Sequence, residues 1–388
     1  MKSLYYIWLQ QALGYGSKHL NTVLERFGDA ENVYKADENL INTLDISSAR
    51  IKNRLSRKCL DKAKEILADC KKNGISVITF GDEHYPDYLC EIPSPPAVLY
   101  VRGNVSLLSA EPSICIVGPR KVSTYGKKAA FSLAARLALC GFTIVSGGAI
   151  GCDTAAHKGA LSVGGKTICV LGAGIASDYL IENKPLRDEI ANKGLLISEY
   201  PPYHNASKFT FPMRNRLMAG LTLGTAVIEA GEKSGALITA NAAAEQNRDV
   251  FVIPGNPTDP HYKGSNKLLR DGAKPLLELA DIITEYLPQF PHKIKPEKAY
   301  SVNISMNQAN ISEKQPEKPK NAEKTKKIIQ DSLSKNAKIV YNQLDKQIFY
   351  IDDICCDELT ASQIIAALTE LEIYGYIEAK PGGRYALK

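Results

Sequence analysis

Glycine-rich loops accompanied by arginine follow several short apolar runs in the middle of the chain. Glycine lets backbone amides approach an anion closely, and the amino end of a following helix favours negative charge. Several such loops on one edge of a sheet would form a phosphate-binding rim. The rim residues that the sequence singles out are Gly118, Arg120, Ser146, Gly147, Gly148, Arg214, Asn215, Arg216, Ser234 and Gly235.

A plainer interpretation is that these glycines only make tight turns between strands and helices. That interpretation suffices for any single loop, whereas several loops on one edge favour anion binding. Lys166 stands at the start of an apolar run. From the residues alone it either joins the same chemistry or is an ordinary solvated lysine.

Cofactor and catalytic signatures fail on inspection. No Gly-x-Gly-x-x-Gly follows the first apolar run, which argues against NAD. Gly164–Thr167 resembles the end of a Walker A loop, but Ala160 stands where its first glycine belongs. Asp153 and His157 could form an acid–base pair, although Asp153 more simply complements a helix dipole. The histidines are scattered and the nine cysteines include no CxxC pair. We therefore expect a protein that holds no metal or cofactor and is not an enzyme.

The elements that must carry the rim alternate between strand and helix. Continuous β-branched runs separated by helical stretches predict a parallel sheet covered on both faces, a doubly wound Rossmann-like domain over 112–286. The predicted strands are 114–117, 143–145, 167–171, 195–197, 226–228 and 250–253, and the predicted helices are 123–139, 153–163, 185–192 and 236–246.

The flanking segments differ in composition from this domain. Residues 1–74 show helical spacing and predict a small helical domain, which either touches DNA backbone or makes packing contacts. Residues 75–111 predict an extended, proline-rich connection. Residues 287–325 are polar and charged and predict a flexible linker. Residues 326–388 predict helices followed by a hairpin, a winged helix that contacts either duplex DNA or protein.

Length and charge set broad limits. The chain has 388 residues, enough for two or three domains, and a net charge of +6, which permits nucleic-acid binding without requiring it. No run reaches the ~18 uninterrupted apolar residues that a membrane span needs. The apolar N-terminal run lacks a signal-peptide cleavage site. We therefore expect a cytoplasmic protein with no membrane partner.

Read together, the loops resemble the DNA-processing protein A family (DprA, also called Smf). The resemblance covers about residues 112–273, and its helical and winged-helix flanks resemble that family's optional modules. It is carried by Ile116–Arg120, Ser146–Gly151, Asp153, Ala156-His157, Gly165–Thr167, Ser198–Pro201, Phe211–Arg216, Glu229-Ala230, Ser234–Ala240, Pro254-Gly255 and Gly264–Asn266.

The resemblance implies a homodimer that binds single-stranded DNA and helps load the RecA recombinase, in natural transformation and homologous recombination. It implies that Arg120 and Lys166 bind phosphates on one edge of the sheet. It also implies that the loop from Phe211 to Asn215 approaches the bases. Ile150 replaces a usual arginine, which leaves open whether that loop touches phosphate.

Two other functions stay open at this stage. A nucleotide-processing enzyme of the nucleoside monophosphate hydrolase class would use a glutamate and an arginine near the fifth predicted strand, and Glu229 and Arg214 could play those parts. Against it, Ser234-Gly235 replaces the proline-glycine-glycine loop expected there. A winged-helix regulator with a nucleotide-sensing central domain is the third hypothesis.

Overall fold

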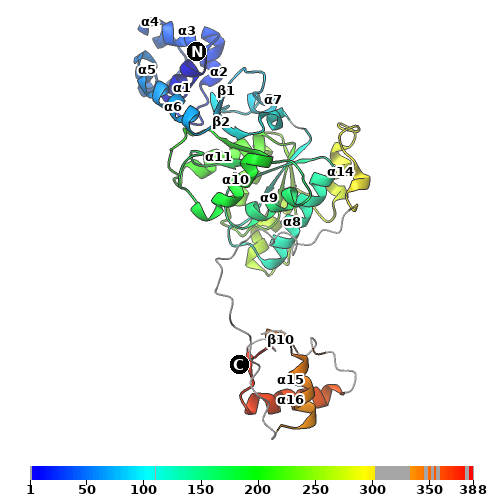
Figure 1. The fold of residues 1–388 in the computed structure, drawn as a ribbon. Helices are drawn as coiled ribbons and strands as arrows, with labels where there is room; N and C mark the ends of the chain where they lie inside the picture. The colour runs from blue at the N-terminus through cyan, green and yellow to red at the C-terminus, as the bar shows by residue number, and fades with distance from the viewer. Residues whose placement is uncertain are drawn as a thin grey trace. The chain divides into compact units, whose positions relative to one another are not determined.

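The computed structural model describes residues 2–109, 111–301, 333–344, 348–350, 354, 359–380 and 384–387. The chain divides into two compact units, residues 1–313 and 314–388. In the first unit a central sheet has helices on both faces, and the N-terminal helices gather at one end (Figure 1).

A nine-stranded sheet forms the centre of the first unit, in the order β1-β2-β6-β5-β4-β3-β7-β8-β9. From β6 to β9 all neighbours pair in parallel, which confirms the predicted doubly wound fold. Its strands are β1 (Ser76–Thr79), β2 (Val98–Gly103), β3 (Ser113–Val117), β4 (Thr143–Gly147), β5 (Thr167–Leu171), β6 (Leu195–Ser198), β7 (Gly224–Val227), β8 (Asp249–Val252) and β9 (Lys274–Pro275).

Alternate residues of the central strands face opposite layers of helices. Ile114 and Ile116 of β3 pack with α8, α9 and α14, whereas Cys115 and Val117 pack with α7, α11 and α12. Both faces are buried, so the strands are largely apolar. The helices that cover the sheet are α7 (Asp87–Cys90), α8 (Thr124–Leu139), α9 (Cys152–Ser162), α10 (Lys184–Lys193), α11 (Thr210–Gly220), α12 (Gly235–Glu245), α13 (Lys263–Arg270) and α14 (Ala280–Tyr286), with short 3-10 turns η1 (Val105–Ser109), η2 (Ile181–Asn183), η3 (Pro260–Tyr262) and η4 (Pro296–Lys298).

The expected N-terminal helical domain is present. Asp29 and Asp37 cap two of its short helices by accepting hydrogen bonds from the backbone amides of Asn32 and Leu40. The domain packs on the sheet through Tyr100 of β2 and shares one apolar core with α10. Its helices are α1 (Lys2–Leu13), α2 (Leu20–Phe27), α3 (Ala30–Lys35), α4 (Glu38–Asn42), α5 (Ala49–Ser56) and α6 (Asp61–Lys72).

The segment 75–111, which the sequence predicts as an extended connection, instead belongs to the sheet. β1 pairs antiparallel with β2, and β2 pairs antiparallel with β6. Residues Val98–Val101 are buried, so this segment completes one edge of the α/β layer. Most of its prolines lie between the two strands, where no ladder hydrogen bond is lost. The α/β unit therefore begins near Ser76, well before Pro112.

The predicted linker also begins too early. Ile294 and Ala299 are buried against the core that α8 and α14 share. The backbone of this segment is tied to α8, because Lys295 donates to the Cys140 carbonyl at 2.9 Å and Arg136 donates to the Ala299 carbonyl at 3.0 Å. A few apolar residues suffice for packing because α8 and α14 already provide an apolar surface. The rest of the predicted linker, residues 302–325, lies outside the described residues.

The second unit has the predicted winged-helix elements. They are α15 (Lys335–Gln343), β10 (Ile348–Tyr350), α16 (Ala361–Ile373), β11 (Ile377–Lys380) and β12 (Arg384–Leu387), with a sheet in the order β10-β12-β11. Thr360 caps α16 as predicted, in a capping box with Gln363. Leu368 and Leu371 of α16 pack with Val340 of α15 in its core. The turn predicted at 381–383 lies outside the described residues.

Candidate nucleic-acid interface

The candidate site lies where the strand order reverses. From β3 the chain builds the sheet toward β6 on one side, and it returns to build β7, β8 and β9 on the other. Loops at such a switch point diverge, and ligands bind in the crevice they leave beyond the carboxyl ends of the strands. A cavity of about 300 Å³ opens there, lined by Val117, Gly118, Pro119, Arg120, Ala149, Asp153, Phe211, Arg214, Asn215, Met218, Ser234, Gly235, Ala236 and Thr239.

One wall of this cavity is a helix where a loop was expected. The family resemblance implies that Phe211 to Asn215 lie on a loop, but they form the first half of α11. Pro212 lies in the first turn of this helix. In the first turn its missing N–H costs no intrahelical hydrogen bond, so the helix tolerates it.

Arg214 is the buried cation of the cavity. Its Nη1 donates to the Val170 carbonyl on β5 at 2.6 Å, and its Nε donates to Asn215 Oδ1 at 2.9 Å. Burial raises the pKa of the Asp153 carboxyl, and the positive charge of Arg214 opposes that shift. Gly147 makes room for Arg214, because a methyl group there would collide with the guanidinium. Arg214 is thus fixed by the carboxyl ends of two strands.

Arg120 is the exposed cation of the cavity. Its guanidinium carbon lies 5.1 Å from the centre of the Phe211 ring, and its Nη2 donates to the Tyr179 hydroxyl at 3.1 Å. The loop that carries it packs closely on the β4–α9 loop. Gly151 has a φ of +101°, and a side chain there would strike the carbonyl of Arg120. The loop can therefore hold Arg120 beside Phe211 only with glycine at 151.

The remaining rim residues divide between lining and support. Gly118, Ser234 and Gly235 line the cavity together with Asn215, whose amide is 3.4 Å from the Gly235 carbonyl. Ser234 also caps α12 by accepting from the Ala236 amide. By contrast, Ser146 is buried in β4 and donates to the Ile116 carbonyl at 2.7 Å. The cavity lining does not include Ser146, Gly147 or Gly148, which thus support the rim without facing the cavity.

Lys166 lies on the opposite edge of the sheet from Arg120, contrary to the prediction. Its carbonyl accepts from the Ile144 amide as β5 begins, and its side chain is exposed. β5 is five residues long, so the two edges are separated by roughly 15 Å. Because parallel strands place all their amino ends together, a residue that precedes β5 cannot share the rim that follows β3.

Arg216 also leaves the predicted rim. It is buried on α11, where its guanidinium forms an ion pair with Glu199 and donates to the Ser94 carbonyl. Glu199 in turn accepts from the Gly16 amide of the N-terminal domain at 3.0 Å. Arg216 therefore joins α11 to that domain instead of facing the cavity.

Asp153 and His157 do not form an acid–base pair. His157 Nδ1 lies 2.7 Å from Thr167 Oγ1 and its Nε2 lies 2.8 Å from the Gly147 carbonyl, while Asp153 accepts from the Ala149 amide. Burial lowers the pKa of His157 to about 4. His157 is thus a buried neutral ring that ties α9 to β4 and β5.

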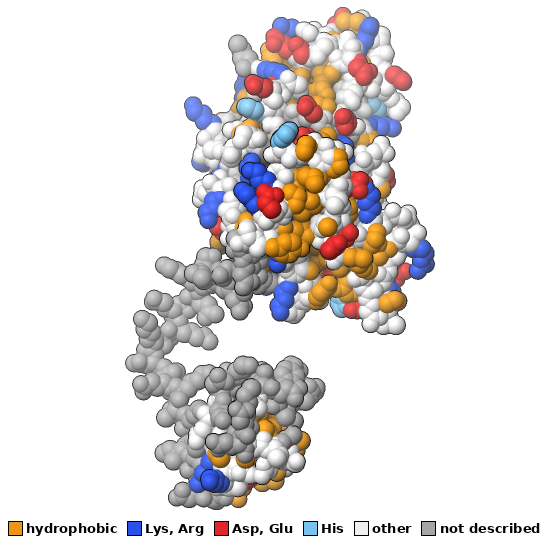
Figure 2. All heavy atoms as spheres, turned by 90° about the vertical axis from the view of Figure 1, so that its right-hand side faces the viewer, with side chains coloured by type: hydrophobic (Ala, Val, Ile, Leu, Met, Phe, Trp, Pro, Cys, Tyr) orange, Lys and Arg blue, Asp and Glu red, His pale blue; other side chains and the backbone are white. Residues whose placement is uncertain are grey.

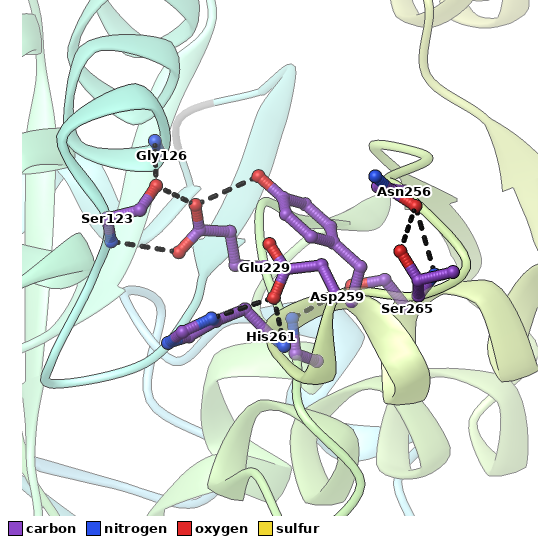
Figure 3. A network of polar contacts seen from close by, with 10 residues as sticks. Ser123, Gly126, Glu229, Asn256, Asp259, His261 and Ser265 are labelled. Atoms are coloured by element: carbon purple, nitrogen blue, oxygen red, sulfur yellow. Dashed lines mark hydrogen bonds and ion pairs between the residues drawn. The ribbon is translucent and has the colours of Figure 1, made fainter. Parts of the chain in front are cut away.

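Glu229, the glutamate of the enzyme hypothesis, is fully buried. Its carboxylate accepts from the Ser123 amide at 3.0 Å, from the Ser123 hydroxyl and from the Tyr262 hydroxyl at 3.0 Å. Figure 3 shows the carboxylate directed at Ser123 where α8 begins. Glu229 is not among the residues that line the cavity. Its position suits a structural anchor between β7, α8 and η3.

Two exposed side chains just before α11 were missed by the sequence reasoning. Lys208 and Phe209 immediately precede α11 and are exposed, Phe209 by 72%. The Lys208 ammonium lies 5.1 Å from the centre of the Phe209 ring. A lysine and two phenylalanines within four positions are a signal for nucleic-acid contact, because cations meet phosphates and aromatic faces meet bases.

Two features are absent from the described part of the chain. No helix there combines the length and hydropathy needed to cross a bilayer. No group of three or more histidine, cysteine, aspartate or glutamate side chains there is placed to hold a metal ion.

Comparison with known proteins gives matches to both units of the chain. The family model described as DNA recombination-mediator protein A matches residues 76–287, and the DprA winged helix domain matches residues 324–383. DNA processing protein DprA of Bacillus subtilis is 40% identical over 244 residues, which cover 63% of this chain and 82% of that protein. Protein Smf of Synechocystis is 32% identical over 399 aligned positions, 98% of each chain.

Solved structures of the same kind are similar as well. DprA of Streptococcus pneumoniae has 35% identity and a TM-score of 0.64, and the match covers 74% of this chain and 99% of that one. DprA of Helicobacter pylori, whose structure is described as giving insight into a single-stranded DNA binding mode, has 31% identity and a TM-score of 0.50 over 55% of this chain and 96% of that one. This chain therefore belongs to the DNA recombination-mediator protein A family.

Proposed function

We propose that this chain binds single-stranded DNA in the switch-point cavity and mediates recombination by delivering the strand to RecA. The observation that carries the proposal is the grouping of Arg120, Phe211 and Arg214 around one crevice. The cations suit phosphates, and the aromatic ring suits a base that is free to stack. A duplex keeps its bases stacked inside, so a single strand exploits this grouping better.

The family description and the Helicobacter pylori relative support the same function. In this proposal Gly118, Ser234 and Gly235 bring backbone close to the strand. Arg120 and Lys208 contact phosphates, and Phe211 stacks on a base. Lys166 and Arg216 have no direct part.

The experiment that tests this is a fluorescence anisotropy titration of oligo-dT and of a matching duplex, each at two salt concentrations. We expect the single strand to bind more tightly, with affinity that falls as salt rises. Tighter, sequence-specific binding of the duplex would replace this proposal with the winged-helix regulator.

The proposed role is binding and not catalysis. The enclosed position of Glu229 supports this, because a carboxylate surrounded by Ser123 and Tyr262 has no access to a nucleotide in the cavity. Incubation with nucleoside monophosphates checks it. Release of free base that is lost in Glu229→Gln would make the chain an enzyme.

Delivery to RecA is the finer part of the proposal, and we place it in the cytoplasm, in natural transformation and homologous recombination. A mediator must speed RecA assembly on strands that are already coated by single-strand-binding protein. We expect the chain to accelerate RecA-dependent ATP hydrolysis on such strands. No acceleration at saturating chain would restrict the function to strand binding.

We also propose a homodimer. Apolar side chains gather over the face of the first unit that carries α14 (Figure 2). Leu277, three residues before the start of α14, is 75% exposed, and an apolar surface of this kind is a candidate interface. Sedimentation of Leu277→Glu should show a shift toward monomer. An unchanged mass would move the interface elsewhere.

A further inference from the structure

Tyr179 touches both side chains that give the cavity its chemistry. It lies between β5 and η2 on the segment that follows Gly174. Its hydroxyl accepts from Arg120 Nη2 at 3.1 Å. Its ring centre lies 5.3 Å from that of Phe211, with the planes tilted by 50°. Arg120 itself lies over the Phe211 ring, so the three side chains form one closed group, each in contact with the other two.

Two features of the backbone hold Tyr179 in place. Arg187, a buried residue of α10, donates a hydrogen bond to the Tyr179 carbonyl. Leu180, the next residue, has a φ of +50°, in the left-handed region that residues with a Cβ rarely adopt. Such a conformation persists only where the surroundings determine it. The position of Tyr179 is therefore set by α10 and not by chance packing at the surface.

This arrangement reduces the entropy that Arg120 loses on binding. An exposed arginine side chain loses rotamer freedom when it binds, and that loss weakens binding. The Tyr179 hydroxyl holds one guanidinium nitrogen, and the Phe211 ring supports its face. The guanidinium has five N–H donors, so donors remain for a phosphate. Arg120 is thus oriented before a strand arrives.

We propose that Tyr179 is a positioning residue of the single-strand site, whose hydroxyl orients Arg120 over Phe211 for phosphate contact. This rests on the proposed function, because it assumes that the strand binds at this cavity. The chemistry needed from residue 179 is a hydroxyl at the end of an aromatic ring. Phenylalanine keeps the ring contact with Phe211 and removes only the hydrogen bond to Arg120.

A double-mutant cycle tests the proposal. Affinity for oligo-dT is measured for the full chain, Tyr179→Phe, Arg120→Ala and the double variant, at several salt concentrations, with a melting curve for each. We expect Tyr179→Phe to weaken binding about two- to tenfold, since one hydrogen bond is at stake. The salt slope should fall by up to ~0.7, one phosphate contact. In the Arg120→Ala background the same change should have no effect.

Tyr203→Phe is the matched control, because the Tyr203 hydroxyl also accepts one side-chain hydrogen bond, from Asn73, and Tyr203 does not line the cavity. It should bind like the original chain. Equal weakening by Tyr179→Phe in both backgrounds would overturn the proposal and make Tyr179 a support of the loop. Tighter binding would mean that Tyr179 obstructs the site, and unchanged binding would mean that Tyr179 has no role in strand binding.

The cycle also separates the two proposals. If a folded Arg120→Ala binds oligo-dT as well as the original chain, the strand binds elsewhere and the proposed function fails at this site. If Arg120→Ala binds weakly while Tyr179→Phe is silent, only the role of Tyr179 is lost.

Discussion

Two of the regions that sequence reasoning associates with DNA differ in charge and surface. The switch-point cavity of the first unit carries Arg120 and Arg214, and the exposed Lys208 lies three residues before its lining residue Phe211. Helix α16 of the winged helix contains no lysine or arginine, and it exposes Ile365 and Ile373. Affinity for a phosphate backbone depends on cations that release its counterions. The winged-helix fold alone therefore does not establish that the second unit binds DNA. The surface of α16 is better suited to a protein partner.

The units also differ in their response to acid. His157 is buried in the first unit, whereas the sequence of the second unit contains no histidine. Burial lowers the pKa of His157 from its usual 6.5 to about 4. Between these values the unfolded chain binds a proton that the folded chain excludes. The contribution of His157 to stability is thus fully present above pH 6.5 and is lost as pH drops toward 4, by up to ~3 kcal/mol at ~1.4 kcal/mol per pH unit.

Denaturant unfolding across this pH range measures the effect, with Trp8 fluorescence as the probe because this single tryptophan lies in the first unit. His157→Gln should flatten the dependence, whereas the exposed His292→Gln should leave it unchanged. A pH-independent free energy of unfolding for the first unit would show that His157 is not a buried neutral ring.

Arg120→Ala should give the largest loss of DNA affinity. A hydrogen-bonded charge contact is worth about 1.5–3 kcal/mol, and its removal should lower the salt slope by ~0.7. The loss should be alike for different base sequences, since phosphate contacts do not specify sequence. Arg120→Lys should restore binding only in part, because lysine lacks the fork of donors.

Lys166→Ala is the control for this comparison of the two sheet edges. It removes the same charge from an exposed lysine at the amino end of β5, and it should bind like the original chain. Equal losses from Arg120→Ala and Lys166→Ala would mean that the strand contacts both edges of the sheet.

Phe211→Ala sharpens the comparison further by separating stacking from charge. If Phe211 stacks on a base, its removal should cost ~1–3 kcal/mol of binding with little change in salt slope. Anisotropy with oligo-dT gives both quantities, and a melting curve shows whether the variant is folded. A large fall in melting temperature with intact affinity would identify Phe211 as a packing residue for Tyr179 and Arg120.

The sequence predicted the strands from β3 to β8 because each is a continuous apolar run, which only a sheet buried on both faces requires. It missed β1 and β2, since the prolines between them are typical of a linker and the strand that pairs with β2 is distant in the sequence. It did not predict α11, because the family resemblance placed the residues around Pro212 on a loop. The failure at β1 and β2 shows that the meaning of a proline depends on where the neighbouring elements begin.

The sequence predicted which loops form the site but not where each side chain points. Gly118, Arg120, Arg214, Asn215, Ser234 and Gly235 do come together with Phe211. Arg216, two positions after Arg214, instead pairs with Glu199. Side chains two apart on a helix do not share a face, so a helix in place of the expected loop separates them. Lys166 was placed by resemblance, and strand direction excludes it from the rim.

Removal of the winged helix should have the smallest effect on strand binding. We expect a chain ending at Ser301 to bind oligo-dT within a few-fold of the full chain, because the cavity is built within the first unit and α16 offers no cations. The end point matters, since Ile294 and Ala299 are part of the core beside α8. A chain cut at 287 should lose thermal stability for that reason, while its remaining folded fraction binds normally. Anisotropy and melting curves on both truncations separate the two effects. A hundredfold loss in a stable chain ending at Ser301 would place the second unit in the primary site, and the contrast between the cavity and α16 would then fail.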